Sequence, residues 1–100
     1  MSIAFDPNGA VLSEASRGTL NSLAQRLTTD SSLQVQLNAY AEGDDDGASK
    51  AKRLSLSRAL AARSFLIEKG VNQTRIEVRA LGNKVPSGPA DRVDIVAQKR

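Results

Sequence analysis

The stretch LSLSRALAARSFLIEKGV, from Leu54 to Val71, decides how this 100-residue chain is interpreted. Lys69 and Gly70 near its end provide a cation in a last helical turn and a glycine after it, a common way for a helix to stop. The pattern predicts a long amphipathic helix from about Ser49 to Lys69. On a helical projection one arc, about 140° wide, collects its apolar residues: Leu54, Ala59, Ala62, Phe65 and Leu66.

Arg58 falls inside this apolar arc, between Phe65 and Ala62. A buried guanidinium without a partner costs roughly 3–5 kcal/mol, so Arg58 needs one. Helical side chains lean toward the helix N-terminus, which points Arg58 toward the acidic stretch that precedes the helix. Two interpretations stay open: a structural role, as an internal salt bridge or with an apolar stem that carries the charge out to solvent, or an anion clamp that binds a carboxylate through two hydrogen bonds.

A second apolar stripe, Leu56, Leu60 and Ile67, lies on the other side of the same predicted helix. One interpretation is packing beneath another helix or a loop of this domain. The other is a contact surface, for the rest of a longer parent protein, for a partner protein or for a second copy of the chain.

Directly before the helix, AYAEGDDDGAS (Ala39 to Ser49) carries four carboxylates. Glu42, Asp44 and Asp46 imitate the first positions of a calcium-binding EF-hand loop, but its twelfth position, which requires a bidentate Glu, is Arg53. We therefore expect no metal here. Asp45 and Asp46 suit a helix N-terminus, where negative charge is stabilising.

Glu42 has a different setting, because it ends a predicted strand at the edge of the sheet where ligands of α/β folds tend to bind. With Arg58 nearby, the site offers one negative and one positive group. That pair suits a zwitterion, with an ammonium on Glu42 and a carboxylate on Arg58.

The remaining segments predict four strands and a first helix. Ser13 is a suitable helix N-cap, and Leu20, Leu23 and Leu27 follow at helical spacing. The order strand, helix, strand, helix, strand, strand favours a mixed four-stranded sheet with both helices packed on it, an α/β two-layer sandwich. The predicted strands are SIAFD (2–6), LQVQLNAYA (33–41), TRIEVRALG (74–82) and RVDIVAQ (92–98).

Composition bounds the function. With 40% apolar and 25% charged residues, residues 1–100 are expected to form a single globular domain. The chain has no cysteine and no histidine, which excludes disulfide scaffolds, Cys/His zinc sites and Ser-His or Cys-His nucleophiles. We therefore expect that the protein is not an enzyme and that it binds no cofactor.

Two further classes of partner are also disfavoured. The only aromatic residues are Phe5, Tyr40 and Phe65, too few for a base-stacking platform, so we expect no nucleic acid despite the net charge of +3. No apolar run approaches the roughly 20 residues of a membrane span. The chain opens with MSIAF in what reads as a strand, so we expect a fragment of a longer protein.

Four segments, AYAEG, LSLSRALAARSFLIEKGV, RIEVRALG and DRVDI, resemble the OmpA-like peptidoglycan-binding domain, and the resemblance covers nearly the whole chain. Its most specific part is the LSxxRA motif, here Leu54, Ser55, Arg58 and Ala59. The resemblance implies a non-catalytic module that grips the diaminopimelate of the peptidoglycan stem peptide. It also implies an envelope protein of a Gram-negative bacterium, in the periplasm, associated with the outer membrane or cell wall.

The resemblance also assigns roles to residues. Glu42 stands where the family has an Asp that holds the ammonium of diaminopimelate, and Arg58 matches the Arg that holds its carboxylate. Asp44 is the reserve candidate for the ammonium. Three further residues are expected near the ligand: Tyr40, Ala41 and Arg92.

The chain departs from the family pattern at several places. The motif GYTD reads Ala39-Tyr40-Ala41-Glu42, the acidic loop is one residue longer, and the first of two closing arginines is Asp91. These changes keep an alternative open: a protein–protein interaction or assembly module with weakened or lost peptidoglycan binding, which contacts its partner through Leu56, Leu60 and Ile67.

Overall fold

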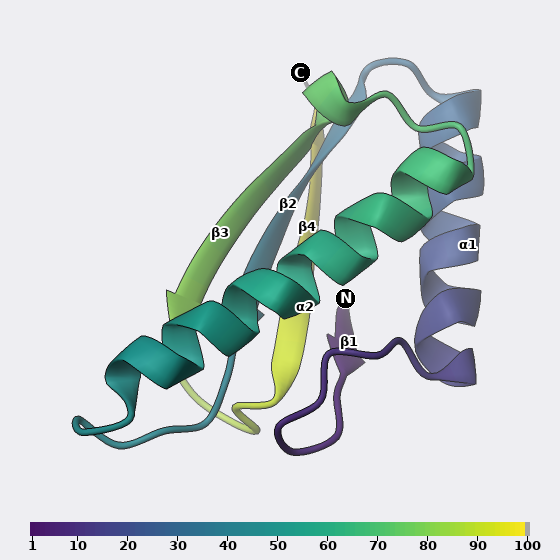
Figure 1. Cartoon of the computed structure of the whole chain (residues 1–100). Helices are drawn as coiled ribbons and strands as arrows, with labels where there is room; N and C mark the ends of the chain where they lie inside the picture. Colours follow the sequence, from purple (N-terminus) through teal and green to yellow (C-terminus); the bar gives the residue numbers. More distant parts are fainter. Residues whose placement is uncertain (100) are drawn as a thin grey trace.

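The computed structural model describes residues 1–99 and places two helices on one side of a four-stranded sheet (Figure 1). The spatial order of the strands is β1-β4-β2-β3. β2 and β3 are parallel, and β4 runs antiparallel to both of its neighbours. This confirms the predicted α/β fold with its mixed sheet. The elements are β1 (Ser2–Ala4), α1 (Glu14–Thr29), β2 (Leu33–Tyr40), α2 (Ala48–Glu68), the short 3-10 helix η1 (Gln73–Arg75), β3 (Ile76–Gly82) and β4 (Arg92–Lys99).

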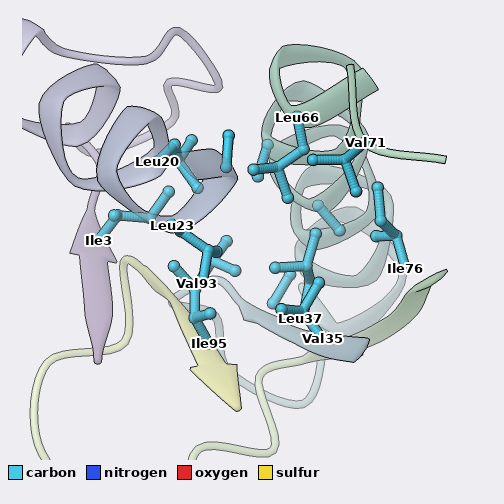
Figure 2. Close-up of a cluster of buried hydrophobic side chains, with 14 of the residues drawn as sticks. Ile3, Leu20, Leu23, Val35, Leu37, Leu66, Val71, Ile76, Val93 and Ile95 are labelled. Atoms are coloured by element: carbon cyan, nitrogen blue, oxygen red, sulfur yellow. The ribbon is translucent and has the colours of Figure 1, made fainter. Parts of the chain in front are cut away.

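The sheet is one-sided because its strands alternate. In β2, Val35, Leu37 and Ala39 are buried toward the helices, and Leu37 lies opposite Ile95 of β4. The residues between them, among them Gln36, point to the opposite, uncovered face. Figure 2 shows side chains of both helices and of β1, β2 and β4 converging on one core.

Helix α1 begins as predicted. The Ser13 Oγ accepts a hydrogen bond from the backbone N–H of Ser16 at 3.1 Å, the arrangement of an N-cap. Leu20, Leu23 and Leu27 are fully or almost fully buried against the sheet and α2. Among the described residues, no helix has both the length and the hydropathy needed to cross a membrane.

Helix α2 lies very close to the end of β3. Ser55 Oγ accepts a hydrogen bond from the backbone N–H of Gly82 at 3.0 Å. Gly82 has a φ of +61°, and a Cβ there would lie 3.2 Å from the Cα of Lys52. The small residues of α2 and the absence of a side chain at Gly82 therefore set the height of the helix above the sheet.

The stripe Leu56, Leu60 and Ile67 points away from the sheet. These side chains are 43%, 41% and 38% exposed. The interpretation that they pack beneath another part of this domain is wrong, because α2 buries the opposite arc, including Ala59 and Ala62.

Gly82→Ala is predicted to lower the free energy of unfolding by about 1–3 kcal/mol, because it adds a side chain at positive φ and against the backbone of α2. Gly18→Ala is the matched control. Gly18 lies inside α1, and a Cβ added there would have no atom within 4 Å. Gly18→Ala should therefore raise the free energy of unfolding by about 0.5–1 kcal/mol. Urea unfolding of both variants measures the difference, and equal effects would contradict the close approach of α2 to β3.

Candidate ligand-binding site

Arg58 makes four side-chain hydrogen bonds at the end of the sheet where β2 stops. Its Nε donates to the Gly9 carbonyl at 2.7 Å and its Nη2 to the Asp6 carbonyl at 3.0 Å. Its Nη1 donates to the Tyr40 carbonyl at 3.0 Å and to Asp91 Oδ1 at 2.9 Å. The guanidinium thus joins the β1–α1 loop, the end of β2 and the residue before β4.

The side chain of Arg58 is completely buried, while that of Asp91 is 19% exposed. The ring of Phe5 lies beneath the guanidinium, 5.2 Å from Cζ to the ring centroid. This geometry matches the internal salt bridge and not the anion clamp. Sequence reasoning did not identify Asp91 as its partner, although the missing closing arginine at position 91 was the available signal.

Glu42 directly follows the buried Ala41, whose backbone N–H donates to the Gly82 carbonyl at 2.9 Å. Its own backbone N–H points to Asp91 Oδ1 at 3.5 Å. The Glu42 carboxylate is exposed and has no hydrogen bond or ion pair within residues 1–99. Its negative charge is therefore available to a ligand.

Two adjoining cavities, of about 200 and 230 Å³, share Asn8, Glu42 and Leu54. We call their combined lining the acidic groove. Arg58 does not line it. The first cavity adds Pro7 and Asp91, and the second adds Gly43, Asp44, Gly47, Lys50 and Ala51.

Asp44 stabilises the backbone turn that leads from the acidic groove into α2. Its Oδ1 accepts a hydrogen bond from the Gly47 backbone N–H at 2.8 Å, which shapes the turn into α2. The Asn83 side chain donates to the carbonyls of Gly43 and Asp44 and holds this turn against the end of β3. Within residues 1–99, no three acidic side chains are grouped so that they could hold a metal ion.

Tyr40, Ala41 and Arg92 do not line the acidic groove. The Arg92 guanidinium lies over the buried ring of Tyr40, with 5.1 Å between the Arg92 Cζ and the ring centroid. Arg92 also pairs with Asp94 at 2.8 Å. Only the Tyr40 carbonyl reaches the site, through Arg58. The structure thus gathers Glu42, Asp44 and, behind them, Arg58, while ligand contact by all six predicted residues stays a prediction.

A larger cavity of about 650 Å³ lies at the opposite end of the sheet, where α1 ends and β2 begins. Two groups at its rim, Asp30 and Lys99, form an ion pair at 3.8 Å. Hydrogen bonds from the side chain and backbone of Ser32 lower the pKa of Asp30. None of the residues singled out in the sequence lines this cavity: Ser22, Gln25, Arg26, Thr29, Asp30, Leu33 and Lys99.

Arg58→Gln is predicted to lower the free energy of unfolding by about 3–5 kcal/mol, because it leaves the Asp91 carboxylate and three carbonyls without their donor. Arg79→Gln is the control, since Arg79 and Glu77 form an ion pair with both side chains 54% exposed. That change should stay within about 0.5 kcal/mol. If urea unfolding gave equally small losses for both, Arg58 would not hold the site together.

Comparison with known proteins bears on the family. The model of the OmpA family matches residues 4–97. The peptidoglycan-associated lipoprotein from Burkholderia pseudomallei has a similar structure, with a TM-score of 0.85, 23% identity, and coverage of 97% of this chain and 89% of that chain.

The C-terminal domain of Helicobacter pylori MotB is also similar, with a TM-score of 0.81, 17% identity, and coverage of 100% of this chain and 85% of that one. The OmpA-like domain of FopA1 from Francisella tularensis is similar as well, with a TM-score of 0.79, 19% identity, and coverage of 98% of this chain and 71% of that one. No curated protein sequence matches the chain. The structural likenesses show the fold, and the match over residues 4–97 shows that the chain belongs to the OmpA family.

Proposed function

We propose that this chain is a non-catalytic peptidoglycan-binding module, one domain of a longer envelope protein that it anchors to the cell wall in the periplasm. Membership of the OmpA family supports this, as does the similar structure of a protein named for its association with peptidoglycan. The observation that carries the proposal is the acidic groove, because it presents the unpaired carboxylate of Glu42 beside Asn8 and Leu54.

The proposed ligand is the stem peptide, whose diaminopimelate side chain ends in an ammonium group. Glu42 accepts this ammonium, and Leu54 provides an apolar wall for the methylene chain. A hydrogen bond to a charged group contributes about 1.5–3 kcal/mol. Asp44 is a second carboxylate in the same groove, although one of its oxygens already binds the Gly47 N–H.

Arg58 supports this site from behind. By holding the Asp6 and Gly9 carbonyls it fixes the loop that carries Pro7 and Asn8, two residues of the groove wall. A direct contact between Arg58 and a ligand carboxylate stays a prediction. It requires the Asp91 carboxylate to leave the guanidinium that it now binds at 2.9 Å.

Glu42→Gln is predicted to weaken binding to purified peptidoglycan sacculi by about tenfold or more, since it removes the charge without changing side-chain length. Asp46→Asn is the control, because Asp46 belongs to the same acidic stretch but does not line the acidic groove. Co-sedimentation of the folded variants with sacculi measures the binding. Equal binding by wild type and Glu42→Gln would place the ligand elsewhere, and no binding by wild type would refute the proposed function.

The second candidate function is an assembly module, favoured by the outward stripe Leu56, Leu60 and Ile67 on α2. In its simplest form the stripe contacts a second copy of the chain. Sedimentation velocity at increasing concentration should then show a dimer that Leu56→Gln combined with Leu60→Gln abolishes, with sacculus binding unchanged. A wild-type chain that stays monomeric throughout would contradict this form of the candidate.

A further inference from the structure

Most N–H donors of the Arg58 guanidinium are already bonded within the protein. It carries five N–H donors, and four of them already bind Asp6, Gly9, Tyr40 and Asp91. Strong recognition of a carboxylate uses two parallel N–H donors of one guanidinium. Only one donor, on Nη2, is without a hydrogen bond among residues 1–99, and the side chain has no exposed surface. Arg58 therefore cannot form a bidentate clamp in this conformation.

The groove itself repels a carboxylate. Three of its lining residues, Glu42, Asp44 and Asp91, are acidic, and Lys50 is its one lining cation. Arg58 balances the charge of Asp91 from behind. An incoming carboxylate that reached for Arg58 would meet Asp91 first, and like charges placed together across an interface cost binding free energy.

Lys50 is a weak substitute for a guanidinium clamp. It is exposed, and its cavity is the one that also contains Asp44. An exposed ammonium on a flexible stem is well hydrated and acts as a single point charge, so a contact with it contributes little. The groove as a whole is suited to a cation.

We infer that the acidic groove recognises the side-chain ammonium of the stem peptide without requiring the neighbouring carboxylate, and that Asp91 is the residue that sets this specificity. This inference rests on the proposed function and narrows its ligand class. Diaminopimelate carries an ammonium and a carboxylate at the end of its side chain. Amidation neutralises that carboxylate, and lysine lacks it. The groove accepts all three forms of the stem.

The role of Asp91 leads to a specific consequence. When the Asp91 carboxylate is removed, one N–H of Arg58 Nη1 becomes free, in addition to the free N–H on Nη2. The Asp91 side chain also no longer separates the guanidinium from the groove. Asp91→Ala therefore converts the groove into a receptor that prefers a ligand with a free carboxylate. Asp94→Ala is the matched control, because it removes an aspartate from the Arg92–Asp94 pair, which does not line the groove.

Isothermal titration calorimetry with three soluble muropeptides, carrying diaminopimelate, amidated diaminopimelate or lysine, tests the inference. For the wild-type chain we expect dissociation constants within about threefold of one another, all raised about tenfold or more by Glu42→Gln. For Asp91→Ala we expect at least a tenfold preference for the free carboxylate, and for Asp94→Ala no preference.

The possible outcomes distinguish a failure of this inference from a failure of the proposed peptidoglycan binding. If wild type binds only the form with a free carboxylate, the inference is overturned while peptidoglycan binding stands. If wild type binds none of the three, the proposed function is refuted. The wild-type measurements decide whether the ligand carboxylate is required even where Asp91→Ala does not fold, because the ligands alone vary the carboxylate.

Discussion

The fold and the site both depend on one buried charge, the guanidinium of Arg58. A buried cation is tolerated only when its charge is paired and its donors are bonded. Here the ion pair with Asp91, three backbone carbonyls and the Phe5 ring meet that requirement. Because these partners belong to segments far apart in the sequence, the need to satisfy Arg58 fixes how the segments meet. The walls of the acidic groove follow from that arrangement.

The same constraint changes what the site can recognise. From the family pattern, Arg58 was expected to face a ligand carboxylate. Here Asp91 replaces an expected arginine and binds Arg58 at 2.9 Å. The positive charge becomes a structural component, while Glu42 keeps an exposed carboxylate. A site expected to bind a zwitterion thereby presents mainly negative charge to solvent.

Much of the fold was predictable, because it depends on local patterns. The alternation from Leu33 to Ala41 predicted β2, and Ser13 marked the start of α1. The pairing of Arg58 was not predictable, since Asp91 is 33 residues away and meets it only when β4 lies beside β2. Its other partners are backbone carbonyls, which have no sequence signature. The sequence placed the Leu56 stripe on the other side of α2, but whether another segment covers that stripe depends on the tertiary arrangement.

The most direct test of the account follows the guanidinium of Arg58 by NMR. Its Nε–H group donates to the Gly9 carbonyl at 2.7 Å inside a fully buried side chain. We expect a slowly exchanging Nε–H resonance that stays in place when a diaminopimelate muropeptide is added, while the backbone amides of Glu42 and Gly43 shift with saturation. A saturable shift of the Nε–H resonance itself would contradict this, because it would show that ligand binding rearranges the buried hydrogen bonds of Arg58.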